Sequence, residues 1–350
     1  MKNRHKTSDI FLATIFAILL FIPCLLFLNT LNNQKTPNPE EKPQTFKAKI
    51  SAYENLLTDS LTLKRELISS YYYIKTKILK ETNITPTVIQ GSEDWLYYSG
   101  NGDGYALESF TGQQIIADTS LLKIKHNLEA QQRWLKKRNI DFYIIMCPNK
   151  QTVYPEYFPY KKGVTVADQI LPYLKKNTDL NIIDLREPLI KAKDGKHFLY
   201  YKTDSHWTYY GGFTGYTEII NQLSVKYPEL KPVPISDYKV VMEEVEGKDL
   251  AEMVNLEKDF KDYKYNFELI NNRNLAKKNI VLFHDSYYKF LRPFFTNHFN
   301  VTERHHQWNS FDYKVIEEVK PEIVIYEVVE RYLNAFSREN PAEIKDTLAN

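Results

Sequence analysis

NIVLFHDSYY, at residues 279–288, joins an apolar run directly to a polar triplet. The apolar half is typical of a strand that is buried on both faces. The triplet His284-Asp285-Ser286 then stands at a strand-to-helix turn. A serine there can expose its hydroxyl, and its backbone N–H can help to hold an oxyanion. The alternative is that Asp285 or Ser286 only caps the following helix, because both residue types are favoured N-caps.

Apolar runs of the same kind recur along the chain between segments with helical spacing. Continuous apolar strands separated by helices are typical of a parallel sheet that helices cover on both faces. The sequence therefore predicts an α/β fold with a mainly parallel sheet flanked by helices. The predicted strands are 141–146, 181–183, 279–283 and 322–327, and the predicted helices are 120–137, 166–176, one that begins near 208 and one that follows 286. Residues 231–275 are less regular and are predicted to form an insertion or connector.

A second polar segment is TDSHW, at residues 203–207. In a parallel sheet, functional residues lie in loops beyond the carboxyl ends of the strands. Asp204 stands two residues before His206, where it can orient the imidazole and stabilise its charged form. The alternative is a surface histidine beside a helix-capping Asp or Ser. With Ser286, the two segments contain all three members of a Ser-His-Asp triad, and such triads occur in several chain orders.

Residues 10–28, IFLATIFAILLFIPCLLFL, contain no charged residue. A helix of this length spans roughly 28 Å, close to the thickness of a bilayer core of about 30 Å. Lys2, Arg4 and Lys6 precede it, so the positive-inside rule keeps the N-terminus cytoplasmic and exports the rest. The run is longer than the apolar part of a signal peptide, and no A-x-A-like site follows it. We expect an uncleaved membrane anchor rather than a cleaved signal peptide.

The anchor defines the expected organisation of the chain. A proline-rich polar stretch follows it and reads as a linker. Residues 47–81 then lack Pro and Gly and carry apolar residues at helical spacing, which predicts a helical stalk. The predicted segments are a basic cytoplasmic tip at 1–9, a transmembrane anchor at 10–30, a linker and amphipathic stalk at 31–86, the α/β domain at 87–335 and a C-terminal tail at 336–350.

Composition excludes several classes of protein. Lys and Arg number 46 against 44 Asp and Glu, so the net charge of +2 gives no footprint for nucleic acid. The two cysteines, Cys24 and Cys147, exclude a disulfide framework. The sequence has no Cys-His cluster with zinc spacing and no phosphate-binding glycine loop of the GxxxxGK or GxGxxG type. We therefore expect no metal and no cofactor.

Six segments, taken in order, resemble one known family. They are GSEDWLYYSGNGDG at 91–104, CPNKQTVYPEYFP at 147–159, YKTDSHWTYYGG at 201–212, GKDLAEMVNL at 247–256, VLFHDSYY at 281–288 and PEIVIYEVVERYL at 321–333. The chain resembles the SGNH-hydrolase-like polysaccharide O-acetyltransferases of the alginate acetylation family, the AlgJ and AlgX type, also described as DHHW proteins. The likeness extends over roughly residues 87 to 335. It departs from the wider SGNH pattern at His284, where a glycine is usual.

The resemblance implies a flavodoxin-like SGNH core and a role for each residue of the triad. Ser286 is expected to be the acyl nucleophile, His206 the general base and Asp204 the residue that orients the base. Members of the family place an acetyl group on an exported polysaccharide, and a membrane-bound O-acyltransferase often supplies that group. The resemblance therefore implies an exported polysaccharide and such a membrane protein as partners, with the catalytic domain outside the cytoplasm.

Four further residues are candidates for substrate binding. Tyr287 could stack on a sugar or pack in the core, and Trp207 could pack against the imidazole or fill the core. Asn149 is a candidate oxyanion donor beside the Ser286 backbone N–H. Lys150 could meet a substrate or pair with an internal carboxylate, and we favour the pairing.

Two other functions remain open from the sequence. A polysaccharide acetylesterase would use the same Ser-His-Asp triad, with water in place of the sugar hydroxyl. A non-catalytic glycan-binding or scaffolding subunit of an export complex would need no triad at all. A buried Ser286, or a His206 beyond hydrogen-bonding reach of it, would favour the scaffold.

Overall fold

The computed structural model describes residues 64–271, 275, 277–305 and 311–338, together with part of 10–21. The chain divides into two compact units, Met1–Leu79 and Lys80–Asn350. In the first unit, α3 (Lys64–Tyr73) continues into a π-helical turn, η2 (Ile74–Ile78). Among the described residues, no helix combines the length and the apolar character needed to cross a membrane.

Several predicted segments fall on residues outside this description. They are the basic tip, most of the predicted anchor, the linker, the first half of the predicted stalk and the chain beyond residue 338. The predicted anchor therefore stays a prediction.

The second unit is built on a five-stranded sheet in which every strand pairing is parallel. The strands lie in the order β4-β3-β9-β7-β8. Their bounds are β3 (Asp141–Cys147), β4 (Asn181–Asp184), β7 (Lys278–His284), β8 (Phe299–His305) and β9 (Ile323–Val329). The prediction of a mainly parallel sheet is confirmed, and each predicted strand forms, with small differences at its ends.

The strand order becomes familiar when β7 is counted first. In chain order the five strands lie as 2-1-5-3-4, and a circularly permuted numbering that starts at β7 turns this into 2-1-3-4-5, the flavodoxin-like order. From β7 the chain adds β8 on one side and then β9 on the other side, so the order in which strands are added switches sides between β7 and β9. In open α/β sheets, ligands bind outside the carboxyl ends of the strands at such a switch point. The loops that follow β7 and β9 are therefore the expected location of a site.

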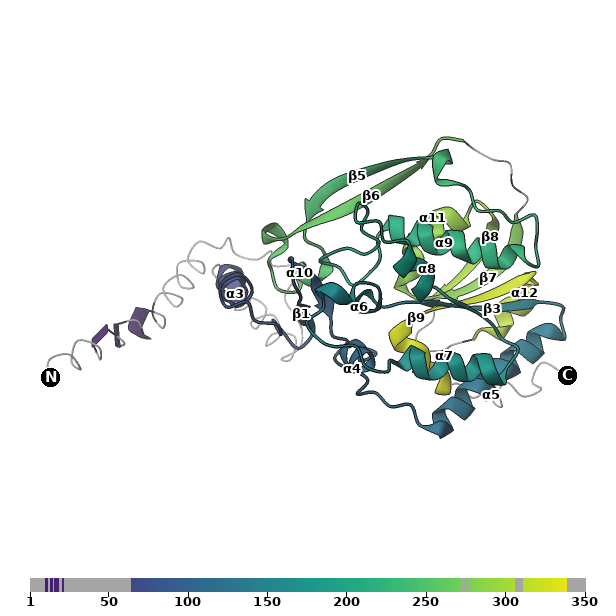
Figure 1. Cartoon of the computed structure of the whole chain (residues 1–350), viewed down its shortest axis with the longest axis horizontal. Helices are drawn as coiled ribbons and strands as arrows, with labels where there is room; N and C mark the ends of the chain where they lie inside the picture. Colours follow the sequence, from purple (N-terminus) through teal and green to yellow (C-terminus); the bar gives the residue numbers. More distant parts are fainter. Residues whose placement is uncertain are drawn as a thin grey trace, which may run out of the picture. The chain divides into compact units, whose positions relative to one another are not determined.

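Helices cover both faces of this sheet (Figure 1). Successive strand residues point to opposite faces, so alternate residues of β7 enter different cores: Ile280 and Leu282 one, Val281 and Phe283 the other. The first core takes in α8 (Arg186–Lys191), α9 (Tyr209–Ser224) and α11 (Arg292–Phe295), and the second takes in α5 (Asp118–Lys136), α7 (Val166–Asn177) and α12 (Tyr313–Val319). This two-sided burial is the reason why the strands read as continuous apolar runs.

The segment 231–275 is more regular than predicted, because it contains an antiparallel hairpin. Its strands are β5 (Tyr238–Glu246) and β6 (Lys261–Leu269), which pair antiparallel along their whole length. Most of β5 is exposed, and its residues VVMEEVE do not alternate apolar with polar. The usual signal of a half-buried strand is therefore missing from this sequence.

The chain after Ser286 also differs in detail from the prediction. It forms a 3₁₀ helix, η6 (Ser286–Phe290), before the short α11. The remaining elements are short and lie around the loops of the sheet. They are β1 (Val88–Gln90), β2 (Leu96–Tyr98), α4 (Ala106–Thr111), α6 (Lys150–Val153), η3 (Pro155–Tyr157), η4 (Ile235–Asp237), α10 (Asp249–Glu252), η5 (Glu257–Asp259) and η7 (Glu330–Ser337).

Candidate active site

Ser286 stands at the carboxyl end of β7 on a loop that Asp285 fixes from two sides. One oxygen of Asp285 accepts the Tyr287 backbone N–H at 2.8 Å and so caps η6. The other oxygen accepts the Val329 N–H at 2.8 Å, which ties the loop to the end of β9. Asp285 is thus buried and holds the loop in place through these hydrogen bonds, while Ser286 is exposed.

Glu327 supports the same loop from β9. Its Oε2 accepts the backbone N–H of Asp285 at 2.9 Å. Burial, followed by the charge of Asp285, raises the pKa of Glu327 well above its ordinary range. A protonated Glu327 supports the loop that carries Ser286 without placing its own buried charge beside that loop.

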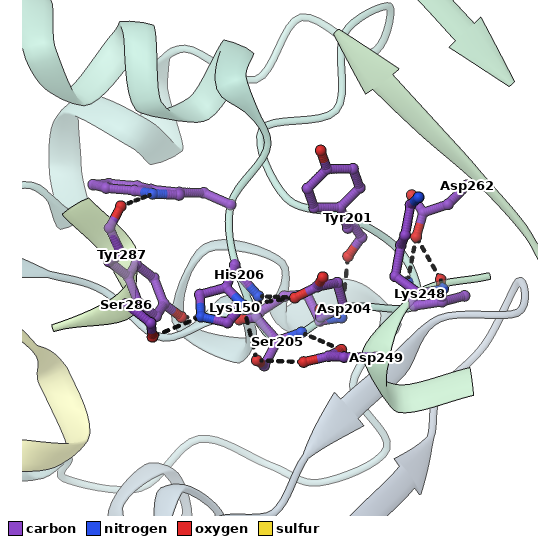
Figure 2. Close-up of polar contacts among 12 residues, drawn as sticks. Lys150, Tyr201, Asp204, Ser205, His206, Lys248, Asp249, Asp262, Ser286 and Tyr287 are labelled. Atoms are coloured by element: carbon purple, nitrogen blue, oxygen red, sulfur yellow. Dashed lines mark hydrogen bonds and ion pairs between the residues drawn. The ribbon is translucent and has the colours of Figure 1, made fainter. Parts of the chain in front are cut away.

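His206 connects Ser286 to Asp204 through its two ring nitrogens (Figure 2). Nε2 of His206 lies 2.7 Å from Oγ of Ser286, and Nδ1 lies 2.7 Å from Oδ1 of Asp204. The same Asp204 oxygen also accepts the His206 backbone N–H at 2.9 Å. An ionised carboxylate can only accept, so Nδ1 carries the proton and Nε2 is left to accept from the serine hydroxyl. The structure thus brings the three residues predicted for a triad into one hydrogen-bonded series.

The charge state of Asp204 suits this arrangement. Burial acts to raise the pKa of Asp204, but the hydrogen bonds and charge of His206, together with the charge of Lys150, outweigh it and lower that pKa. Asp204 is therefore ionised at neutral pH. An ionised carboxylate at Nδ1 holds the imidazole in the tautomer that can take a proton at Nε2.

Lys150 anchors the segment that carries Asp204 and His206. Its ammonium donates to the backbone carbonyls of Tyr201, Lys202 and Asp204 at 3.1, 3.0 and 2.7 Å. Burial lowers the pKa of Lys150 to about 8, against the opposing effect of the nearby carboxylates. Its side chain is buried, so the substrate contact considered for Lys150 is contradicted, and the internal partners it binds are carbonyls rather than a carboxylate.

The β5–β6 hairpin holds this segment from its other side through Asp262. The Asp262 carboxylate accepts the backbone N–H groups of Lys202 and Thr203 at 3.0 and 2.8 Å, and the Thr203 hydroxyl at 2.5 Å. The Thr203 hydroxyl in turn accepts the Lys248 N–H at 2.8 Å. Burial raises the pKa of Asp262, and these hydrogen bonds oppose that rise.

Asp249 is a second carboxylate beside His206 that the sequence reasoning missed. Its two oxygens accept the backbone N–H and the hydroxyl of Ser205, each at 3.1 Å. It lies inside GKDLAEMVNL, one of the family-like segments, but nothing in that segment assigns it a chemical role. Burial, followed by the charge of Asp204, raises the pKa of Asp249 to about 6.

Asp204, His206 and Asp249 place one potential ligand atom each within 4.8 Å of one another. Their donor set could in principle contact a cation. However, Nδ1 of His206 and Oδ1 of Asp204 are bound to each other. The three residues therefore fit a hydrogen-bonded relay better than a metal site.

The two aromatic residues predicted to bind substrate are fully buried, and this prediction is wrong. Trp207 donates its indole N–H to the Tyr287 carbonyl at 3.0 Å. Tyr287 donates its hydroxyl to the Ser205 carbonyl at 2.9 Å. Both rings fill the space behind the site, where they fix the His206 segment to the nucleophile loop. Neither ring faces solvent, so neither can stack on a sugar.

Asn149 is also buried, at the carboxyl end of β3. Its backbone N–H donates to Glu330 at 2.9 Å, and its side-chain oxygen lies 3.4 Å from a guanidinium nitrogen of Arg331. These contacts are to Glu330 and Arg331 rather than to Ser286, so the role of Asn149 as an oxyanion donor stays a prediction.

A cavity of about 410 Å³ lies beside the end of β9. Arg331 lines it and reaches toward the site, with its guanidinium carbon 6.0 Å from the ring centre of Tyr287. Tyr332 also lines it and donates its hydroxyl to Asp103, another lining residue. Tyr105 lines it as well and is 48% exposed. A ligand in this cavity would lie next to residues that pack on the nucleophile loop.

Comparisons with known proteins identify a family for this chain. The family described as "SGNH hydrolase-like domain, acetyltransferase AlgX" matches residues 88–287, more than half of the chain. That range includes Asp204, His206 and Ser286. No curated protein sequence matches the chain.

Two solved structures share the fold at low sequence identity. The O-acetyltransferase domain of Pseudomonas putida AlgJ is 17% identical, with 76% of this chain and 97% of that chain covered and a TM-score of 0.50. Bacillus cereus PatB1 is 16% identical, with 71% and 98% covered and a TM-score of 0.52. The predicted resemblance is confirmed by the family match: the chain belongs to the AlgX family of SGNH hydrolase-like acetyltransferase domains.

Proposed function

We propose that this protein is a polysaccharide O-acetyltransferase that works through an acetyl-serine at Ser286. The observation that carries the proposal is the pair of 2.7 Å contacts that join Ser286, His206 and Asp204, with the serine exposed to solvent. A hydroxyl becomes an effective nucleophile when an adjacent base within hydrogen-bonding reach can take its proton. The family match and the AlgJ and PatB1 folds support this chemistry.

The first half-reaction loads the enzyme. Oγ of Ser286 attacks the carbonyl carbon of the acetyl donor while Nε2 of His206 takes the hydroxyl proton. Asp204 stabilises the imidazolium that results. Collapse of the tetrahedral intermediate breaks the bond to the leaving group, which takes the proton from His206. The acetyl-serine remains.

Backbone donors at the start of η6 are the candidates for holding the oxyanion. The Tyr287 N–H is already committed to Asp285, which leaves the N–H of Ser286 itself as the nearest candidate. Asn149 would be a second donor from the end of β3.

The second half-reaction transfers the acetyl group. A sugar hydroxyl attacks the acetyl-serine, and His206 again takes the proton and returns it to Oγ of Ser286. Water competes with the sugar, so the acceptor must be positioned to win. The cavity beside Arg331 and Tyr332 is the proposed place where the acceptor binds.

The same residues would act as an acetylesterase if water took the place of the sugar. The scaffold alternative is disfavoured, because it would call for a buried Ser286 or a distant His206.

We also propose that residues 10–28 anchor the protein with its catalytic unit outside the cytoplasm, and that a membrane-bound O-acyltransferase supplies the acetyl group. Protease added to intact cells should then remove the catalytic unit, and a fusion reporter after residue 30 should be active only outside the cytoplasm.

A transfer assay tests the proposed activity. The full-length protein is incubated with an acetyl donor and oligosaccharide acceptors, and acetylated sugar is measured by mass spectrometry. We expect transfer, and Ser286→Ala or His206→Ala should each reduce it by about 10³-fold or more. Free acetate without acetylated sugar would identify an esterase, and full activity of Ser286→Ala would refute the mechanism.

A further inference from the structure

Asp249 gives His206 a second carboxylate, in addition to the one at Asp204. It is the first residue of α10, in the connection between the strands of the hairpin, and it reaches the site from a different element. Its oxygens hold Ser205 by both the backbone N–H and the hydroxyl. The Ser205 hydroxyl oxygen in turn lies 3.3 Å from Nδ1 of His206 (Figure 2). A continuous polar path therefore runs from Asp249 to the imidazole.

The direction of each hydrogen bond follows from what each group can do. Asp249, when ionised, can only accept, so the Ser205 hydroxyl donates its proton to it. A lone pair of Ser205 then faces the Nδ1–H of His206, whose main acceptor is Asp204 at 2.7 Å. The imidazole N–H thus faces two oxygen atoms. One belongs to the Asp204 carboxylate, and the other is the Ser205 hydroxyl, which is hydrogen-bonded to the Asp249 carboxylate.

We propose that Asp249 is a positioning residue that, through the Ser205 hydroxyl, holds the His206 imidazole and stabilises its protonated form. This inference rests on the proposed role of His206 as the general base. When Ser286 attacks, its proton moves to Nε2 of His206, and the Nδ1 proton stays on the imidazole, hydrogen-bonded to Asp204. No proton moves to Asp249, which contributes only its charge and its hold on Ser205.

The charge of Asp249 would affect His206 during the reaction. Ligand atoms of Asp204, His206 and Asp249 lie within 4.8 Å of one another, and the other ionisable groups that face Asp249 are Lys150 from α6 and Tyr98 from β2. While His206 is neutral, two close carboxylates repel each other. When the imidazole becomes charged, both carboxylates attract it. The arrangement therefore favours the charged imidazole over the neutral one.

The test is the pH dependence of kcat/KM for p-nitrophenyl acetate with the full-length chain, which needs no sugar acceptor. Asp249→Asn keeps an acceptor for the Ser205 N–H and removes the charge. Glu252→Gln, an exposed residue of the same helix α10, removes the same charge away from the site and is the matched control. We expect Asp249→Asn to move the acidic limb about one pH unit lower and Glu252→Gln to leave it in place.

A purely structural role for Asp249 gives a different result. It would lower kcat/KM by the same factor at every pH or leave it unchanged, and either outcome would overturn the inference. Asp249→Ser, a second uncharged variant, should move the limb in the same direction.

A second measurement does not depend on activity. In a Ser286→Ala background, the His206 imidazole resonances are followed by NMR as the pH changes. We expect the midpoint of their titration to fall when Asp249→Asn is added.

If neither uncharged variant folds, the Ser286→Ala protein alone decides. The titration curve of its His206 signal should show a second step from Asp249, and a single step would contradict the inference. Loss of transfer with this behaviour intact would instead count against the proposed function.

Discussion

At the scale of single residues, the pKa values of two neighbouring carboxyl groups, Asp204 and Asp249, are shifted in opposite directions. The hydrogen bonds from His206 keep Asp204 ionised despite its burial, whereas burial and the neighbouring Asp204 charge favour the protonated form of Asp249. One carboxylate is therefore permanently available to orient the base, and the other responds to the charge of the imidazole. This separation of roles comes from environment rather than residue type.

The raised pKa of Asp249 predicts how stability depends on pH. An acid whose pKa is about 6 when folded and about 3.9 when unfolded stabilises the fold fully below pH 4, and this contribution is lost as the pH rises to 6. Asp249→Asn never bears the charge. We therefore expect it to be more stable than the parent at pH 7, by roughly 2 kcal/mol, and equal to it near pH 4. Urea unfolding at both pH values measures this, and an equal difference at both would contradict it.

The sequence allowed the residues of the candidate triad to be predicted, but not the carboxylates that hold the triad segment in place. Asp204 and His206 could be predicted because they lie two residues apart in the polar segment TDSHW. Ser286 could be predicted because it follows a clearly apolar strand. Asp249 and Asp262 lie far along the chain, in a hairpin whose sequence has no catalytic pattern. Tyr287 was considered for sugar stacking and Trp207 for packing against the imidazole or filling the core, and only the fold shows that both rings are enclosed.

At the scale of elements, the β5–β6 hairpin is a support for the catalytic segment. Asp262 of β6 binds the backbone of Lys202 and Thr203, and α10 between the strands supplies Asp249. The hairpin is also the element that the sequence predicted least well, because most of β5 is solvent-exposed and its side chains do not alternate. The strands of the main sheet were predictable for the opposite reason: burial on both faces demands continuous apolar residues.

Removal of the Thr203 hydroxyl tests the supporting role of the hairpin. Thr203→Val takes one donor from the buried Asp262 carboxylate and one acceptor from the Lys248 N–H. We expect a loss of about 1–3 kcal/mol in the free energy of unfolding, with a fall in kcat as the Asp204–His206 segment loosens. Thr203→Ser keeps the hydroxyl and should remain close to the parent. Equal unfolding midpoints and rates for all three proteins would argue against this role.

At the scale of the whole molecule, the site lies where the topology of the sheet predicts a ligand. Counted from β7, the strand order is flavodoxin-like, and the switch point falls between β7 and β9. Ser286 follows β7, and Arg331 and the cavity follow β9. The sequence could predict the parallel sheet but not this order, because chain order alone does not say which strands become neighbours.

The cavity that follows β9 is lined by none of Ser286, His206 and Asp204, so a change in it should affect acceptor binding without affecting the chemical step. Tyr105 lines the cavity and is half exposed, and it makes no contact in the hydrogen-bonded series at Ser286. Tyr105→Ala should raise KM for an oligosaccharide acceptor by about fivefold, equivalent to about 1 kcal/mol of binding, while hydrolysis of p-nitrophenyl acetate is unchanged. Tyr105→Phe keeps the ring and should have the smaller effect. An unchanged acceptor KM in both variants would place the acceptor elsewhere.

The central claim is that Ser286 carries the acetyl group, and trapping that intermediate tests it most directly. The full-length protein is exposed briefly to p-nitrophenyl acetate, quenched in acid and mapped by peptide mass spectrometry. We predict one added acetyl group on the peptide that contains Ser286, strongly reduced in His206→Ala and absent in Ser286→Ala. Release of nitrophenol by Ser286→Ala at the parent rate, or an adduct on another residue that turns over in its place, would contradict the mechanism.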